Sequence, residues 1–143
     1  MSTPDYYKYD DGETHFECFD ISRYYSGDWA QVIQYVFRWR KKGGVEDLEK
    51  ALACANDAYH NGIECKLIVD NRSTLNAVRR RLLRLRNNRY ASAPNFWNLV
   101  SSCDGYEPTV IEELKKIIKK AKRRRAYRLK SSENPTNSMA ESV

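Results

Sequence analysis

The residues best suited to chemistry gather between positions 38 and 50. Eight charged side chains fall in this stretch, at Arg38, Arg40, Lys41, Lys42, Glu46, Asp47, Glu49 and Lys50. Arginine and lysine donate hydrogen bonds to phosphate oxygens, and a carboxylate such as Asp47 can hold a magnesium ion. The cluster is therefore typical of a phosphate pocket. It is equally consistent with an internal arrangement in which Arg40 lies at the edge of the core or pairs with Glu46 or Asp47.

Two predicted helices place this cluster at the turn between them. The first runs from Asp28, its predicted N-cap, to about Lys42, and its apolar stripe consists of Trp29, Val32, Ile33, Val36 and Phe37. On an ideal helix Arg40 lies about 20° from Trp29, on the buried face, where it needs an anion. Gly43-Gly44 ends this helix, and a second one with small alanines continues to Asn61-Gly62. Residues 28–61 are thus expected to form an antiparallel helical hairpin.

The run YVFRWRKKGGVEDLEKA, residues 35–51, resembles the core motif of a small phage-encoded domain family called SaV-like, whose relatives include a nucleotide kinase of T-odd coliphages. The resemblance covers residues 5–61, and Ala30, Gln31 and Gln34 depart from the family pattern. It implies a phage protein that binds or phosphorylates deoxynucleoside phosphates, with Mg²⁺ as cofactor if it is a kinase. The phosphate-binding candidates are Tyr35, Arg38, Arg40, Lys41 and Lys42, and the catalytic candidates are Asp47, to position magnesium, and Lys50, to stabilise the transferring group. The sequence contains no G-x-x-x-x-G-K-[ST] phosphate loop, so whether the protein is an enzyme stays open.

A second candidate site follows from the uneven charge of the chain. Residues 1–65 hold 7 Lys/Arg against 12 Asp/Glu, whereas residues 66–143 hold 18 against 7. Two predicted helices and the segment beyond them carry the candidates for binding nucleic acid: Arg80, Arg81, Arg84, Lys115, Lys119, Lys122, Arg123, Arg124 and Arg125. The alternative function is therefore a non-enzymatic protein that binds DNA or RNA, or that inhibits an acidic host protein. The same charges could instead be solvated and matched to the acidic half of the chain.

Aromatic residues near these basic segments are candidates for stacking on unpaired bases, although some have the spacing of core residues. They are Tyr90, Phe96, Trp97, Tyr106 and Tyr127.

The remaining patterns predict an all-α, single small domain. Ser73 is expected to cap a helix that runs to about Asn88, and Pro94 to begin a short helix that ends at Asp104-Gly105. Thr109 and Glu112 form a capping box for the last helix. The expected organisation is an extended arm (1–14), the hairpin region (15–61) with a short helix or turn over 15–25, a connector at 63–70, basic helices packed on the hairpin (62–130) and a disordered tail (131–143).

Several classes of protein are disfavoured by what the sequence lacks. Cys18, Cys54, Cys65 and Cys103 form no C-x-x-C pair, so we expect no metal site. The longest stretch without charge is too short to span a membrane, and the N-terminus does not resemble a secretory signal. We therefore expect a cytoplasmic protein of a host cell with no membrane partner, of open oligomeric state, whose partners are nucleotides, nucleic acid or an acidic protein.

Overall fold

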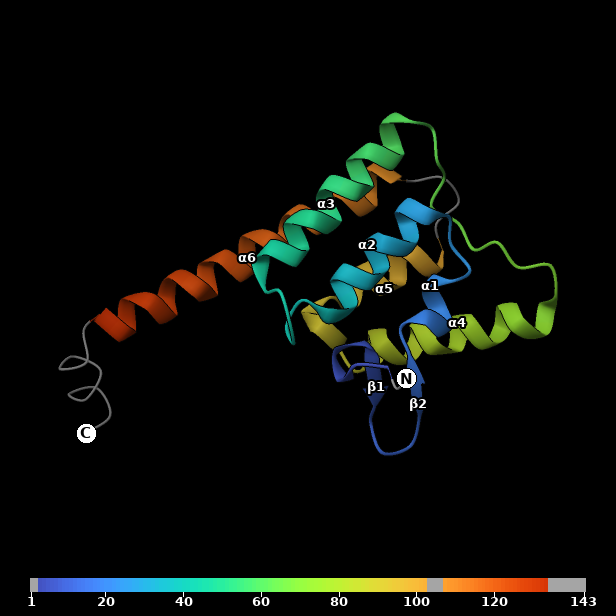
Figure 1. The fold of residues 1–143 in the computed structure, drawn as a ribbon, viewed down its shortest axis with the longest axis horizontal. Coiled ribbons are helices and arrows are strands. Elements are labelled where there is room, and N and C mark those ends of the chain that lie inside the picture. The colour runs from blue at the N-terminus through green and yellow to red at the C-terminus, as the bar shows by residue number, and fades with distance from the viewer. Residues whose placement is uncertain (1–2, 103–106, 134–143) are drawn as a thin grey trace.

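The computed structural model describes residues 3–102 and 107–133 and is mainly helical, as predicted. Six α-helices accompany one two-stranded sheet and two short 3-10 segments in the part of the chain described. In chain order these are η1 (Asp5–Tyr7), β1 (Lys8–Asp10), β2 (His15–Glu17), α1 (Phe19–Ser22), α2 (Gly27–Arg38), α3 (Val45–His60), α4 (Arg72–Asn87), η2 (Tyr90–Ser92), α5 (Pro94–Ser101) and α6 (Glu107–Glu133). Figure 1 shows α2 and α5 in the middle of the molecule, with α3 and α6 on one side and α4 on the other.

Helices α2 and α3 run in opposite directions and pack along each other (Figure 1). The whole predicted apolar stripe of α2 is buried, and Ala51, Ala55 and Ala58 of α3 are fully buried, so the two backbones can lie close together. Gly44 precedes α3 as its N-cap and has φ +62°, a left-handed conformation that favours glycine. The predicted N-cap of α2 is wrong: the helix begins at Gly27, and Ser26 precedes it in an extended conformation.

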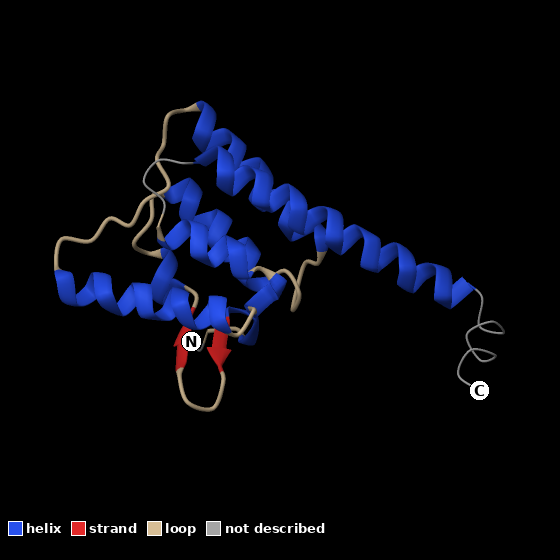
Figure 2. Ribbon diagram, turned by 180° about the vertical axis from the view of Figure 1, so that it is seen from behind, coloured by secondary structure: helices blue, strands red, loops and turns tan. Residues whose placement is uncertain are grey.

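Helix α6 has a buried half and a projecting half. Its apolar stripe from Val110 to Ala121 is buried, mostly against α3 and α5. From Lys122 to Ser131 every residue is exposed, and the helix extends away from the rest of the protein (Figures 1 and 2). The helix already begins at Glu107, so Thr109 lies in its first turn and is not the predicted N-cap. The buried carboxylate of Glu107 accepts a hydrogen bond from the Cys65 amide at 2.8 Å, which fixes the connector between α3 and α4.

Helix α4 begins two residues earlier than predicted. Its N-cap is Asn71, whose side chain accepts a hydrogen bond from the Thr74 amide at 2.7 Å, so the prediction of Ser73 as the cap is wrong. Val78, Leu82 and Leu85 form its buried face. The connector over residues 63–70 contains no strand, as predicted. The predicted end of α5 at Asp104-Gly105 lies outside the described residues.

The N-terminal segment is folded onto the protein, so the prediction of an extended arm is wrong. Strands β1 and β2 pair antiparallel with Tyr9 opposite Phe16, and these two buried rings stack with their centroids 4.8 Å apart. Burial of this aromatic pair gives the segment a reason to fold. The predicted disordered tail begins too early, because residues 131–133 belong to α6; residues 134–143 lie outside the described part. None of the described helices is long and apolar enough to span a bilayer.

Candidate functional site

The centre of the predicted phosphate pocket is a buried ion pair. Arg38 ends α2 and Asp47 lies in the first turn of α3, so the hairpin brings them together. Arg38 donates from Nε and Nη2 to the two carboxylate oxygens of Asp47, at 3.1 and 3.2 Å. The Asp47 side chain is only 2% exposed and also accepts a hydrogen bond from the Gly43 amide at 3.0 Å. A side chain at position 43 would collide with this carboxylate, so the turn requires glycine there.

Tyrosines surround the exposed side of this ion pair. Arg38 donates to the Tyr7 hydroxyl at 3.0 Å, and its guanidinium carbon lies 5.0 Å from the Tyr35 ring centroid. Tyr6 covers the neighbouring Lys42, which lies 4.5 Å from its ring centroid and donates to its hydroxyl at 3.1 Å. Tyr6 and Tyr7 lie in the segment predicted to be an extended arm, so the sequence pattern did not place them in this cluster.

The geometry favours a structural role for Asp47. Both of its carboxylate oxygens already accept hydrogen bonds from Arg38 or Gly43, which leaves the group poorly suited to hold magnesium. Burial alone would lower the pKa of Arg38, but its hydrogen bond to Asp47 reverses this, so the pKa lies above the usual value and the guanidinium stays charged. Among the described residues no three His, Cys, Asp or Glu side chains come together in a way that could hold a metal ion. Lys50 lies beside the Tyr35 ring, at 5.9 Å from its centroid.

Arg40 and Lys41 are exposed, and the prediction that Arg40 lies on the buried face is wrong. Helix α2 ends at Arg38, so the ideal wheel does not extend to residue 40. Trp39 is buried instead, with its indole nitrogen donating to the Ala91 carbonyl at 2.8 Å. Arg40 donates to the Ser92 hydroxyl at 2.7 Å, and Lys41 donates to the Lys8 carbonyl at 3.3 Å.

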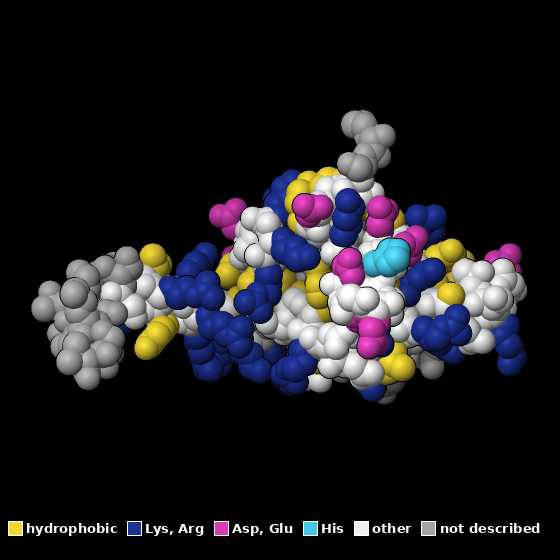
Figure 3. Space-filling model, turned by 90° about the horizontal axis from the view of Figure 1, so that it is seen from below, with side chains coloured by type: hydrophobic (Ala, Val, Ile, Leu, Met, Phe, Trp, Pro, Cys, Tyr) yellow, Lys and Arg dark blue, Asp and Glu magenta, His cyan; other side chains and the backbone are white. Residues whose placement is uncertain are grey.

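Two adjoining hollows form a basic groove between the α2–α3 turn and α6. Their volumes are about 270 and 120 Å³, and they share Trp39, Ala121 and Arg124 as lining residues. Three segments supply the cations of this basic groove: Arg40 and Lys42 from the turn, Arg89 from the link between α4 and η2, and Lys120, Arg124, Arg125 and Arg128 from α6. Figure 3 shows Lys and Arg side chains gathered along this part of the molecule.

The basic groove has no internal counter-charge in the described part of the chain. No Asp or Glu lines either hollow, and none of the seven groove cations takes part in an ion pair within residues 3–102 and 107–133. Seven positively charged side chains around an open groove repel one another and attract anions from solution. The arrangement can therefore bind an anionic ligand with several charges.

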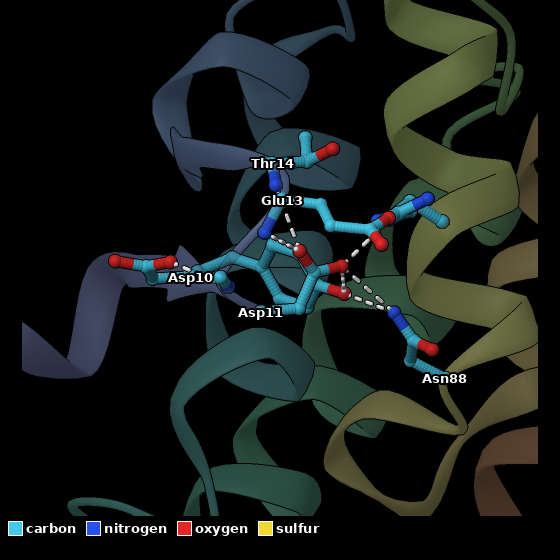
Figure 4. Close-up of polar contacts among 8 residues, drawn as sticks. Asp10, Asp11, Glu13, Thr14 and Asn88 are labelled. Atoms are coloured by element: carbon cyan, nitrogen blue, oxygen red, sulfur yellow. Dashed lines mark hydrogen bonds and ion pairs between the residues drawn. The ribbon is translucent and has the colours of Figure 1, made fainter.

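The arginines of α4 are used differently. Arg84 donates to Asp11 and to Glu13, at 2.6 Å each, and both acids lie in the β1–β2 turn. Figure 4 shows the Asp11 carboxylate at the centre of this cluster, where Asn88 also donates to it. The Arg84 hydrogen bond holds the pKa of Asp11 well below its usual value, and Asp11 and Glu13 raise the pKa of Arg84. Arg81 donates to the Asp20 carbonyl at 2.9 Å, whereas Arg80 is exposed.

The predicted nucleic-acid residues therefore fall on two separate helices. Arg80, Arg81 and Arg84 belong to α4, and the other candidates belong to α6, which lies on the opposite side of α5 (Figure 1). Of the α6 candidates, Arg124 and Arg125 line the basic groove. Lys119, Lys122 and Arg123 are exposed outside it, and Lys115 pairs with Glu112 at 3.2 Å.

Two of the five aromatic residues suggested for base stacking lie in the core. Phe96 and Trp97 are fully buried. Tyr90 is half-buried, and burial raises the pKa of its hydroxyl to about 12. Tyr106 lies outside the described residues, and Tyr127 on the projecting half of α6 is 72% exposed. Stacking on several successive bases is therefore not supported by the described surface.

Comparison with known proteins gives no family assignment: no family model, curated protein or solved structure matches this chain. The resemblance of residues 35–51 to the SaV-like family stays a prediction.

Proposed function

We propose that this protein binds the phosphate backbone of a nucleic acid in its basic groove, without catalysis. The observation that carries this proposal is the gathering of seven cations from three segments without an acidic side chain among the described lining residues. A phosphate backbone presents repeated negative charges that such a surface can neutralise, with release of the bound counterions.

The shape of α6 supports an extended ligand. The helix spans 27 residues, which corresponds to roughly 40 Å, and its distal half is exposed on all sides. Further basic residues follow the groove along this half of the helix. Lys122, Arg123 and Lys130 add to its positive electrostatic potential. Because Phe96 and Trp97 lie in the core and Tyr90 is half-buried, a duplex fits the surface better than a single strand.

The test is a binding measurement with a fluorescent DNA duplex, the matching single strand and the matching RNA duplex. We expect the native protein to bind a duplex, and Arg40→Glu/Arg124→Glu to weaken that binding by about tenfold or more, because both changes place a negative charge in the groove. The matched control, Arg79→Glu/Arg80→Glu, changes two exposed arginines on α4 and leaves duplex affinity within about twofold. Equal losses in both double variants, or no binding by the native protein, would rule the proposal out.

A second candidate function is the binding or phosphorylation of deoxynucleoside phosphates. The larger hollow, of about 270 Å³, is lined by Arg40 and Lys42, two of the residues predicted to bind phosphate. This size suits a small ligand, and the SaV-like resemblance favours the same class of ligand. The occupied Asp47 carboxylate argues against magnesium at that residue, so this candidate rests on the groove cations for charge stabilisation.

Transfer of phosphate from ATP to deoxynucleoside monophosphates tests this second candidate. Product formation by the native protein that is lost in Lys42→Ala but kept in Lys116→Ala would support a kinase. Absence of product with all four deoxynucleotides, together with tight duplex binding, would leave nucleic-acid binding as the function.

A further inference from the structure

The outer face of α4 carries an apolar side chain among arginines that form no ion pair with the described residues. Arg79, Arg80, Leu83 and Arg86 are all exposed, and their spacing places them on one face of the helix. Leu83 is 46% exposed, so this face presents apolar surface beside its arginines. The helix itself contains no Asp or Glu, so no acid within it can pair with these arginines.

The Leu83 side chain lines two hollows and forms a ridge between them. Each hollow has a volume of about 420 Å³. Ala77, Arg80 and Asn87 line the hollow on one side, together with Thr14 of the β1–β2 turn. Arg79, Arg86 and Asn98 line the hollow on the other side. Both hollows thus combine an apolar wall at Leu83 with a basic rim.

Helix α4 already binds carboxylates from another part of the same protein. The β1–β2 turn is an acidic loop whose Asp11 and Glu13 seat on Arg84, at the edge of the first hollow. One helical turn earlier, Arg80 has no acidic partner among the described residues, and neither has Arg79. Within residues 3–102 and 107–133, Arg86 donates only to the amide oxygens of Asn87 and Asn98. The face therefore continues an acid-binding surface whose remaining positions are empty of carboxylates in this part of the chain.

We propose that the outer face of α4 is a docking site for an acidic peptide segment of another protein. Carboxylates of the segment pair with Arg79, Arg80 and Arg86, and its apolar side chains enter the hollows on both sides of Leu83. A phosphate backbone could use the arginines but has no apolar group for Leu83, so the ridge favours a peptide over a nucleic acid. The surface is separate from the basic groove, and this proposal does not depend on the function proposed there.

The probe is a displayed library of random linear peptides, selected against the full chain. We expect the enriched peptides to be acidic and to carry regularly spaced leucine, isoleucine or phenylalanine. The affinity of the best peptide is then measured by calorimetry for the native protein, Leu83→Ser and Arg79→Glu/Arg80→Glu. Each variant should weaken binding by about tenfold or more, since one removes the apolar ridge and the other reverses two charges. The control Lys116→Glu/Lys119→Glu, on exposed positions of α6, should stay within about twofold.

The changed side chains are exposed, so we expect every variant to stay folded. Melting curves of all variants check that a loss of peptide affinity is not caused by unfolding. The proposal would be overturned if the selection gave no enrichment above the unselected library, or if the enriched peptides had no net negative charge. It would also be overturned if Leu83→Ser left the peptide affinity unchanged. A fourth contrary result is that Arg79→Glu/Arg80→Glu loses duplex DNA binding and retains peptide binding. The last result would assign the face to nucleic acid.

Discussion

Two groups of cations in this molecule differ in what neutralises them. Arg38 and Arg84 are each held by carboxylates from a neighbouring turn, at 3.1 and 2.6 Å. The basic groove, with Arg124 and Arg125 at its α6 side, contains no carboxylate among the described lining residues. Charge counts alone treat these arginines as equivalent. The contrast indicates that the first group stabilises the fold and the second group is available to a ligand.

Removal of the buried acid should give the largest effect on stability. Asp47→Ala leaves Arg38 charged and nearly buried without its partner, and we expect the free energy of unfolding to fall by about 3–5 kcal/mol. Urea denaturation followed by circular dichroism measures this change. The control is Glu46→Ala, an exposed neighbour in the same helical turn, expected within about 0.5 kcal/mol of the native protein. Similar values for the two variants would show that the ion pair is not structural.

Charge reversal in the groove should affect binding and leave stability alone. For Arg124→Glu/Arg125→Glu we expect a loss of duplex affinity and a salt dependence whose slope, log K against log salt, is smaller by about 2. The free energy of unfolding should change by less than about 0.5 kcal/mol, because both side chains are exposed. A large drop in the free energy of unfolding would show that Arg124 and Arg125 stabilise the fold, as Arg38 and Arg84 do.

The Asp11 carboxylate predicts a pH-dependent contribution to stability. Its pKa in the folded protein is lowered, chiefly by Arg84 and then by Tyr9, so the stabilisation is present above the unfolded-state pKa of about 3.9 and is lost as pH falls below it. Asp11→Asn should therefore denature at lower urea than the native protein at pH 7, and the difference should shrink as the solution is acidified.

Asp10→Asn is the matched control, because Asp10 is exposed and accepts only the Gly12 amide, which an asparagine oxygen can also accept. A difference between the native protein and Asp11→Asn that stays constant from pH 7 to acidic pH would contradict this interpretation.

Substitution of Arg89 should change duplex binding without lowering the free energy of unfolding, and its effects are the smallest expected among these variants. It has φ +52°, in the left-handed region that favours glycine, and it lines the groove. Arg89→Gly should keep or raise the free energy of unfolding, by up to about 1 kcal/mol, while the salt slope of duplex binding falls by about 1. A clear loss of stability, measured by the same denaturation, would indicate that the arginine side chain itself holds the turn.

The helical framework could be predicted because its signals are local. The apolar stripe of α2 is buried as its spacing indicated, and the turn between α2 and α3 lies at Gly43-Gly44 as predicted. The errors concern short elements and ends. The strands have three residues each, too few for a visible period, and Arg40 was misplaced because α2 ends two residues before it.

The candidate site was only partly visible for a different reason. Arg84 and Asp11 are 73 positions apart, so the sequence gives no sign that they pair. The groove likewise joins Arg40 to Arg124 from elements far apart in the chain. Both arginines were predicted to bind anions, but at two different sites, because only the packing of α6 beside the hairpin brings them together.

The most direct test of the difference between paired and unpaired cations is a map of the amides that shift in heteronuclear NMR spectra when a short DNA duplex is added. The account predicts that the largest shifts fall at residues 39–44, 89–92 and 117–128, around the basic groove. Shifts centred instead on residues 79–87 of α4, or on the Arg38 and Asp47 pair, would contradict it.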